Sequence, residues 1–476
     1  MTKALNELTI VEAGKGLRAK EFTVRELWDA CVAAAHEKNP ELNAYLEIFG
    51  ADAAAIDAAQ ARIDAGNAPA LCGIPLAIKD NILIEGKVAS AASKMLENYV
   101  ATYDATVIRK LKEAGALFVG RTNMDEFAMG SSTENSAFGP SKNPYDTARV
   151  PGGSSGGSAS AVAANMCIAA LGTDTGGSIR QPAAHTGLTG IKPTYGSVSR
   201  HGLIALGSSL DQAGPLAKSV DDARLLLAAL AGQDSLDATT IPEGLYAAAE
   251  DKKQLVIGVP RHLLSEGIDP DVLSAFEDAL KALEAKGHTV KEVSLPTSSY
   301  ALPAYYVVMP AEASTNLARF DGVRYGLAKR GETLLRDYVE SKTAGFGKET
   351  IRRILLGTFV LSAGYIDAYY KKAERARDLL RKECNDAFSE CDVIAFPTTP
   401  SPAFRFGEKS DPVAMYLEDV FTVTANLTGM PAISVPMGTV ERDGKTLPIG
   451  IHFTAPHGAD DVLFTIGNDV GRTLAA

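Results

Sequence analysis

Cysteine is scarce in this chain. Only five cysteines occur among 476 residues, and no two of them share C-x-x-C spacing. Secreted proteins held by disulfides use paired cysteines densely, and structural zinc sites need closely spaced cysteine or histidine ligands. We therefore expect reduced thiols in the core, with neither a disulfide framework nor a zinc site. The five positions are Cys31, Cys72, Cys167, Cys384 and Cys391.

Histidine is also infrequent, with seven residues and no H-E-x-x-H pair. Because zinc hydrolases of that type bind their metal through two histidines on one helix face, metal-assisted hydrolysis has little support. We expect this chain to hold no metal and no cofactor. The sequence also has no apolar run long enough to cross a bilayer and no signal-peptide order at its N-terminus. These features favour a cytoplasmic protein without membrane contact.

An excess of positive charge is missing as well. The net charge is -11, whereas a protein that grips nucleic acid over a broad surface needs a positive field. The densest basic stretch, residues 370–383, alternates with acidic and apolar residues at helical spacing, which is typical of a solvated helix face. Extensive direct binding of RNA by this chain is therefore disfavoured.

No linker of low complexity and no fixed-period repeat divides the chain, so we expect a single domain over residues 1–476. Helix-like and strand-like segments alternate, which predicts an α/β fold with a central mixed sheet covered by helices on both faces. Residues 300–391 predict a mainly helical segment beside that sheet.

The individual elements follow from capping signals and apolar periodicity. Expected helices are one opened by the capping box at Thr23, and residues 51–65, 104–114 with Asp104 as cap, 219–231, 269–285 and 459–470. Expected strands are residues 73–78, 116–119, 255–259, 289–295, 393–396, 433–435 and 448–453.

Two glycine clusters that carry serines, residues 152–158 and 173–183, lie close together in the sequence. Glycine lets backbone amides approach a ligand closely, so each cluster can direct N–H groups at a developing oxyanion beside a nucleophilic serine. A flexible linker is the usual alternative for one such run. Here the first cluster continues into a helix-like segment and residues 168–172 are apolar enough to enter a core, which disfavours a linker.

The pattern alone does not settle which serine attacks. Residues 152–156 also satisfy the G-x-S-x-G nucleophile elbow, but that motif needs a buried strand before it, and residues 143–151 form a polar loop bracketed by prolines. A P-loop is excluded because no Gly-Lys-Ser/Thr follows the glycines. Residues 14–19 fit a loose dinucleotide-binding pattern, which we discount because the next helix signal begins only at Thr23.

Together with the Lys79-Asp80-Asn81 step, the clusters resemble the amidase signature family, whose hydrolases cleave carboxamides with a serine, a bridging serine and a lysine. By motif, the resemblance assigns these roles to Ser178, Ser154 and Lys79, within a signature core at about residues 71–232. It also implies the amidase signature fold and a cis peptide bond before Ser154. The resemblance further implies that the oxyanion is held by the backbone amides of Thr175, Gly176, Gly177 and Ser178.

The chemistry of such a site explains why a lysine can serve as the base. A serine hydroxyl needs a neighbouring base to become a good nucleophile, and a lysine amine can act if burial lowers its pKa. An isolated lysine is more often a surface residue in a salt bridge. Residues 73–78 read as a buried strand that delivers Lys79 to the interior, which favours the base.

The resemblance narrows to one branch of the family, the glutaminase subunits (A-type) of bacterial amidotransferases that act on Glu-tRNA(Gln) or Asp-tRNA(Asn). It covers nearly the whole chain and includes residues 120–135, 208–212, 316–326 and 352–359. It implies a glutaminase that supplies ammonia within a heterotrimer. A B-type subunit would bind the aminoacyl-tRNA and use ATP and magnesium, and a C-type subunit would brace the pair.

A glutamine pocket should offer one cation and one anion, because the ligand carries an α-carboxylate and an α-ammonium. By resemblance we choose Arg353 and Asp419, with Arg352 and Glu418 as neighbouring alternatives, and a backbone contact from Gly130. Two other functions stay open. A free-standing amidase acting on another small carboxamide is the alternative enzyme, and a catalytically inactive scaffold is disfavoured because the lysine and both serines are present.

Overall fold

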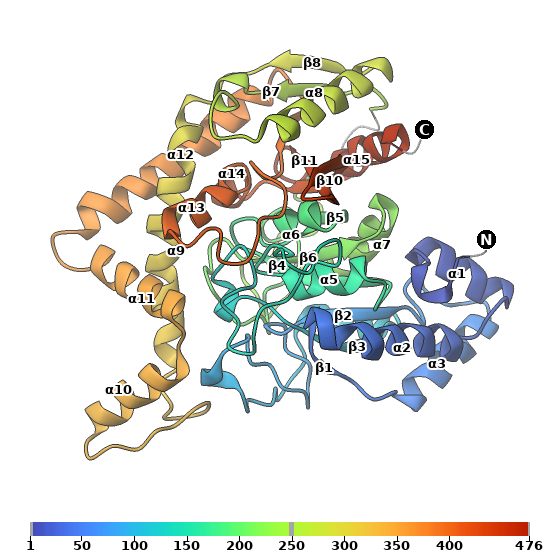
Figure 1. Ribbon diagram of the computed structural model, residues 1–476, viewed down its shortest axis with the longest axis horizontal. Coiled ribbons are helices and arrows are strands. Elements are labelled where there is room, and N and C mark those ends of the chain that lie inside the picture. The colour runs from blue at the N-terminus through green and yellow to red at the C-terminus, as the bar shows by residue number, and fades with distance from the viewer. Residues whose placement is uncertain (1–2, 247–251, 475–476) are drawn as a thin grey trace.

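One mixed sheet of 11 strands runs through the computed structural model, which describes residues 3–246 and 252–474 (Figure 1). The strand order is β1-β3-β2-β4-β6-β5-β10-β11-β9-β7-β8. The pairs β2–β3 and β2–β4 are parallel, whereas β4–β6 and β10–β11 are antiparallel, which confirms the mixed sheet. The strands are β1 (Tyr45–Ile48), β2 (Pro75–Lys79), β3 (Leu117–Thr122), β4 (Ala169–Asp174), β5 (Thr189–Lys192), β6 (Gln212–Ala217), β7 (Val256–Val259), β8 (Thr289–Glu292), β9 (Val393–Pro397), β10 (Ala432–Arg442) and β11 (Lys445–Thr454).

Four strands, β1, β4, β5 and β6, were not predicted as strands from the sequence, although the apolar residues of β4 were expected in the core. Strand β6 contains Gly214 and Pro215, and both residue types normally argue against a strand interior. The glycine is required by a close approach of two strands, because a Cβ at Gly214 would lie 2.2 Å from the carbonyl oxygen of Ile191. The segments that position the site thus include a strand with an unfavourable local sequence.

Helices cover the sheet in two rows that contact the same central strands, β5, β6 and β10. One row contains α5 and α6, and the other runs from α4 through α7 and α15 to α8, each helix contacting the next. This arrangement agrees with the prediction of helices on both faces. The helices are α1 (Ile10–Ala19), α2 (Val24–Leu42), α3 (Ala53–Asp64), α4 (Thr106–Glu113), α5 (Gly156–Ala163), α6 (Arg180–His185), α7 (Val220–Leu230), α8 (Pro270–Ala285), α9 (Ala301–Asn316), α10 (Leu334–Gly345), α11 (Lys348–Val360), α12 (Lys371–Ala387), α13 (Pro412–Tyr416), α14 (Val423–Thr428) and α15 (Asp460–Leu474).

The two predicted helix caps have different outcomes. Thr23 caps α2 as expected, since its hydroxyl accepts from the amide of Glu26 and the Glu26 carboxylate accepts from the amide of Thr23. The prediction for Asp104 is wrong, because α4 begins after Ala105 without a side-chain cap. The Asp104 carboxylate instead accepts hydrogen bonds from the amide of Glu85 and from Lys112.

The predicted helical segment at residues 300–391 is confirmed. Helices α9, α10, α11 and α12 lie along one flank of the molecule, at the left of Figure 1. Helix α9 packs against α11, α12 and α14. Its Tyr305 also approaches the second glycine cluster, because a Cβ at Gly176 would lie 2.5 Å from the Tyr305 hydroxyl. Residues from the flank can therefore complete a pocket beside the sheet.

The cysteines are buried and unpaired, as their scarcity predicted. Among the helices of the described residues, none is long and apolar enough to cross a membrane. Over the same ranges, no group of three His, Cys, Asp or Glu side chains is arranged to hold a metal ion.

Candidate active site

Lys79 ends strand β2 and is completely buried, as the apolar residues before it predicted. Strand β2 lies between β3 and β4, so its last residue projects where the carboxyl ends of parallel strands meet. Among the described residues, the Lys79 Nζ atom donates to hydroxyl and carbonyl oxygens and not to a carboxylate. Its partners are Ser154 Oγ at 2.8 Å, Ser155 Oγ at 2.8 Å, Thr173 Oγ1 at 2.9 Å and the Thr173 carbonyl at 3.2 Å.

Burial lowers the pKa of Lys79 to about 7. The carboxylates of Asp125, Asp174 and Asp211 raise this pKa, but their effect is smaller than that of desolvation. A large fraction of the amine is therefore neutral near pH 7, which is the form that can accept a proton. The arrangement differs from the surface salt bridge that is common for isolated lysines.

The two glycine clusters come together at the serines. The Gly153–Ser154 peptide bond is cis, as the family resemblance implied. The amide of Ser155 donates to the carbonyl of Ser178 at 3.1 Å, which places the second cluster against the first. Ser178 is 7% exposed. Within the described residues, the hydroxyls of Ser154 and Ser178 make no hydrogen bond with each other, so contact is present only in the Lys79–Ser154 half of the predicted relay.

The sequence did not single out Ser155 or Thr173, which share the Lys79 amine with Ser154. Ser155 also donates to the carbonyl of Thr173 at 3.2 Å. The paired serines of the first cluster were a visible signal, but a linear motif does not tell which of two adjacent hydroxyls turns toward the base. In the structure, the hydroxyls of Ser154 and Ser155 both contact the Lys79 amine.

The loop between β4 and α6 carries the predicted oxyanion amides, and it differs from the prediction at one of them. The amide of Gly177 donates to Asp174 Oδ1 at 2.9 Å and is therefore engaged. The amides of Thr175, Gly176 and Ser178 make no hydrogen bond within residues 3–246 and 252–474, so these three can be offered to a ligand. The fourth amide, that of Gly177, is engaged because the side chain of Asp174, the last residue of β4, folds back over the turn.

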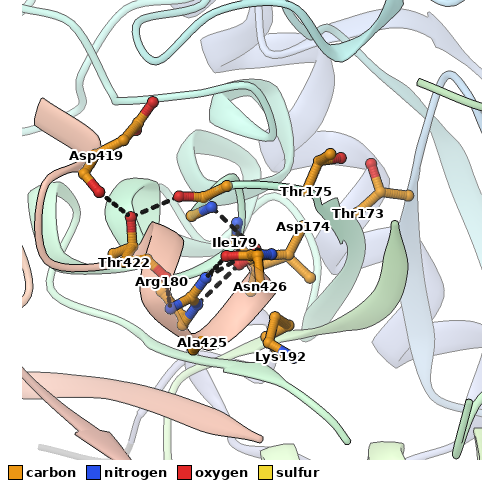
Figure 2. A network of polar contacts seen from close by, with 12 residues as sticks. Thr173, Asp174, Thr175, Ile179, Arg180, Lys192, Asp419, Thr422, Ala425 and Asn426 are labelled. Carbon is orange, nitrogen blue, oxygen red and sulfur yellow. Dashed lines mark hydrogen bonds and ion pairs between the residues drawn. The ribbon is translucent and has the colours of Figure 1, made fainter. Parts of the chain in front are cut away.

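Asp174 is fixed in turn by a buried ion pair (Figure 2). Arg180 donates to both oxygens of Asp174, to Asn426 Oδ1 at 2.6 Å and to the carbonyl of Thr422 at 2.9 Å. Burial opposes ionisation of Asp174, but the Arg180 guanidinium and its hydrogen bonds hold the pKa of this carboxyl well below its usual range. A buried pair with this many hydrogen bonds gives the nucleophile loop one defined arrangement.

Arg353 and Asp419 both contact a pair of stacked tyrosines. The rings of Tyr306 and Tyr416 are 3.9 Å apart, and the Arg353 guanidinium carbon lies 5.4 Å from the centre of each ring. The Tyr306 hydroxyl donates to Asp419 Oδ2 at 3.1 Å. Arg353 also donates to Glu349 Oε1 at 2.7 Å. The two predicted anchors thus belong to one group of contacting side chains, the anchor cluster (Tyr306, Glu349, Arg353, Tyr416 and Asp419), built from α9, α11, α13 and the turn Leu417–Asp419.

Asp419 accepts hydrogen bonds from hydroxyls, those of Ser131 and Tyr306, and is not in an ion pair within the described residues. Burial raises its pKa to about 7, against the opposing effects of these hydroxyls and of Arg353. A buried carboxylate without a basic partner is costly, and a ligand ammonium would relieve that cost. This residue is therefore suited to bind a cation.

The neighbouring alternatives face elsewhere. The side chain of Arg352 is 50% exposed, compared with 4% for Arg353, and pairs with Glu349. The buried carboxylate of Glu418 is already paired with Lys409. Both arginines pair with Glu349, so burial alone favours Arg353 over Arg352, whereas the pairing of Glu418 with Lys409 favours Asp419 over Glu418.

Gly130 precedes Ser131, whose hydroxyl bonds Asp419, and it has no room for a side chain. A Cβ at Gly130 would lie 2.4 Å from Cγ of Asp125. Gln181 connects this loop to the serine cluster, since its Nε2 donates to the carbonyl of Ser131 and its Oε1 accepts from the amide of Gly153. The anchor cluster and the lysine–serine cluster are therefore joined by a chain of hydrogen bonds through Ser131 and Gln181.

The chain is similar in sequence to known proteins. The chain is 51% identical to the A-type subunit of the glutamyl-tRNA(Gln) amidotransferase of Roseiflexus sp. (strain RS-1), over 98% of this chain and 96% of that protein. The Desulfatibacillum aliphaticivorans protein of the same name is 49% identical, with 98% and 97% covered.

Solved structures show the same fold. The crystal structure of the A-type subunit of the glutamyl-tRNA(Gln) amidotransferase from Thermotoga maritima matches with a TM-score of 0.82 at 40% identity, over 99% of this chain and 95% of that one. The peptide amidase from Stenotrophomonas maltophilia matches with a TM-score of 0.80 at 28% identity, over 99% and 97%. The Amidase family model matches residues 26–464, and the chain therefore belongs to the amidase family.

Proposed function

We propose that this chain is the glutamine-hydrolysing subunit of a tRNA-dependent amidotransferase. The observation that carries the proposal is the anchor cluster, in which Arg353 and Asp419 both contact Tyr306, connected through Gln181 to a buried lysine–serine cluster. Glutamine presents an α-carboxylate to the guanidinium and an α-ammonium to the buried carboxylate. The similarity to A-type subunits of glutamyl-tRNA(Gln) amidotransferases supports the same assignment.

In the proposed reaction the neutral amine of Lys79 takes a proton from the hydroxyl of Ser154, and Ser154 takes one from Ser178. The Ser178 oxygen attacks the side-chain carboxamide carbon of glutamine, and the free amides of the β4–α6 loop stabilise the oxyanion. The proton returns through Ser154 to the leaving nitrogen, so ammonia departs and a glutamyl ester of Ser178 remains. Water then hydrolyses that ester, releasing glutamate and restoring the serine.

In this proposal, the ammonia is used outside this chain, on a partner subunit. A B-type subunit binds Glu-tRNA(Gln) or Asp-tRNA(Asn) and activates its carboxylate with ATP and magnesium, and a C-type subunit completes a cytoplasmic heterotrimer. The net charge of -11 supports this division, because the chain itself is poorly suited to hold RNA over a broad surface. The alternative is a free-standing amidase, which the similarity to peptide amidase keeps open.

An amidation assay separates these two functions. The chain is purified from its natural host together with any accompanying subunits and incubated with glutamine, ATP, magnesium and Glu-tRNA(Gln) or Asp-tRNA(Asn). We expect glutamine-dependent formation of the amidated aminoacyl-tRNA, and loss of that product when the chain is removed and ammonia is not supplied. Isolation without partners, combined with faster hydrolysis of aryl or aliphatic amides than of glutamine, would favour the free-standing enzyme.

Substitution of Arg353 tests the anchor cluster. We expect Arg353→Ala to raise KM for glutamine about 10- to 100-fold, the range given by losing a hydrogen-bonded contact with a charged group. KM for a neutral amide without a carboxylate should change far less. Steady-state ammonia release measures both values. The matched control is Arg352→Ala, which removes the half-exposed neighbour and should leave KM for glutamine near that of the unmodified chain. Equal losses on both substrates would place the glutamine carboxylate elsewhere.

A further inference from the structure

The peptide unit between Gly176 and Gly177 is held at both ends. Its carbonyl accepts from Thr422 Oγ1 at 2.6 Å, and its N–H donates to Asp174 Oδ1 at 2.9 Å (Figure 2). Because a peptide unit is planar, hydrogen bonds at both ends fix its rotation. The amides of the adjacent peptides, those of Gly176 and Ser178, are then directed by this one unit.

Thr422 has two possible acceptors for one hydrogen. Its Oγ1 lies 2.6 Å from the Gly176 carbonyl and 3.1 Å from the carbonyl of Asp419. A hydroxyl donates a single hydrogen, and the shorter distance assigns it to Gly176. The Thr422 amide donates to the same Asp419 carbonyl at 3.0 Å. Thr422 and Asp419 therefore belong to one hydrogen-bonded turn, and movement of one changes the position of the other.

The turn that contains Asp419 and Thr422 packs tightly against the loop between β4 and α6. A Cβ at Gly177 would lie 2.3 Å from Thr422 Oγ1, and a Cβ at Gly176 would lie 2.5 Å from the Tyr305 hydroxyl. Arg180 donates to the carbonyl of Thr422 and to the carboxylate of Asp174, so one guanidinium holds both residues that fix the peptide. A small shift of the turn is therefore passed on to the loop.

We propose that Thr422 is a positioning residue whose hydroxyl couples occupancy of Asp419 to the orientation of the Gly176–Gly177 peptide. This inference rests on the proposed function, in which Asp419 binds the α-ammonium of glutamine. When the ammonium is bound, the turn is held and the amides beside the peptide point at the developing oxyanion. Thr422 thereby makes the rate of the chemical step depend on the amino group of the substrate.

The test compares glutamine with 4-carbamoylbutanoate, which has the same carboxamide and carboxylate but no α-amino group. Thr422→Val keeps the shape of the side chain and removes the donor. We expect it to lower kcat for glutamine about 10- to 100-fold, up to the loss seen when a direct oxyanion donor is removed, with little change in KM. The loss for 4-carbamoylbutanoate should be much smaller, and Thr422→Ser should restore turnover of glutamine.

Three results would overturn the inference: a change in kcat below about twofold, which lies far under the effect of a lost oxyanion donor; equal losses on the two substrates; or a change confined to KM. If thermal unfolding shows that Thr422→Val does not fold, Thr422→Ala and Thr422→Ser give the same comparison, because both only remove atoms. Glutamine hydrolysis by the unmodified chain is measured alongside. Its absence would contradict the proposed function, whereas normal hydrolysis with an unaffected Thr422→Val variant contradicts only the coupling.

Discussion

Lys79→Ala and Lys79→Arg are each expected to reduce glutamine hydrolysis at least about a thousandfold, as loss of the base does in other serine hydrolases. Alanine removes the amine, and arginine keeps a charge that is not released at any working pH. Steady-state ammonia release measures the loss. Near-normal turnover in either variant would rule out lysine as the base.

The pH profile gives this prediction a second readout. The pKa of Lys79 is lowered to about 7, so the proton leaves and the basic form appears as pH rises through that value. The pKa of Asp419 is raised to about 7, and its carboxylate must also lose a proton to bind an ammonium. Both changes increase kcat/KM for glutamine as pH rises. With 4-carbamoylbutanoate the contribution of Asp419 drops out and the rise depends on Lys79.

Lys192 provides a matched control for Lys79. It is also fully buried, and burial lowers its pKa to about 7, but its Nζ donates to the carbonyl of Pro193 at 2.9 Å and contacts neither serine. Lys192→Met should therefore keep most of the turnover. If this variant lost activity while Lys79→Ala kept it, the assignment of the base would be reversed.

Ser178→Ala is expected to abolish covalent chemistry and to lower glutamine hydrolysis by a comparable factor, at least about a thousandfold. An electrophilic glutamine analogue should add its mass to the peptide that contains Ser178 in the unmodified chain and leave the alanine variant unlabelled. Mass spectrometry of the digested protein measures the label. Labelling of Ser154 or Ser155 in its place would transfer the nucleophile to the first glycine cluster.

Ser160 is a suitable control for that experiment. It is a buried serine of helix α5, and its hydroxyl donates to the carbonyl of Lys142 instead of contacting Lys79. Ser160→Ala should hydrolyse glutamine and accept the label. This outcome would show that loss of labelling in Ser178→Ala is not a general effect of removing a buried hydroxyl.

Much of the fold could be predicted from local patterns. Strand β2 is a short apolar run, and α2 begins at a capping box, so both were recognisable without tertiary information. Strand β6 was missed because the reason for Gly214 is the carbonyl of Ile191 on a neighbouring strand, which no window of the sequence contains. Asp104 was misassigned because Lys112 competes for its carboxylate. That residues 1–476 form a single domain stays a prediction.

The candidate site, like the fold, has some residues that local motifs identify and others that they do not. Lys79, Ser154 and Ser178 lie in motifs with characteristic spacing, and the roles given to them stay predictions. The tyrosine that contacts both Arg353 and Asp419 was not predicted, because Tyr306 comes from a helix more than a hundred residues from Asp419 in the sequence. Contacts of that range depend on packing between elements, and a single sequence contains no signal for them.

The anchor cluster and the lysine–serine cluster are built from different parts of the chain. Arg353 belongs to the helical flank, whereas Lys79 ends strand β2 of the sheet. Replacement of residues on α11 can therefore change which amide is accepted while the bonds around the lysine stay as they are. An architecture of this kind lets selection, or an engineer, retarget the enzyme without rebuilding its reactive centre.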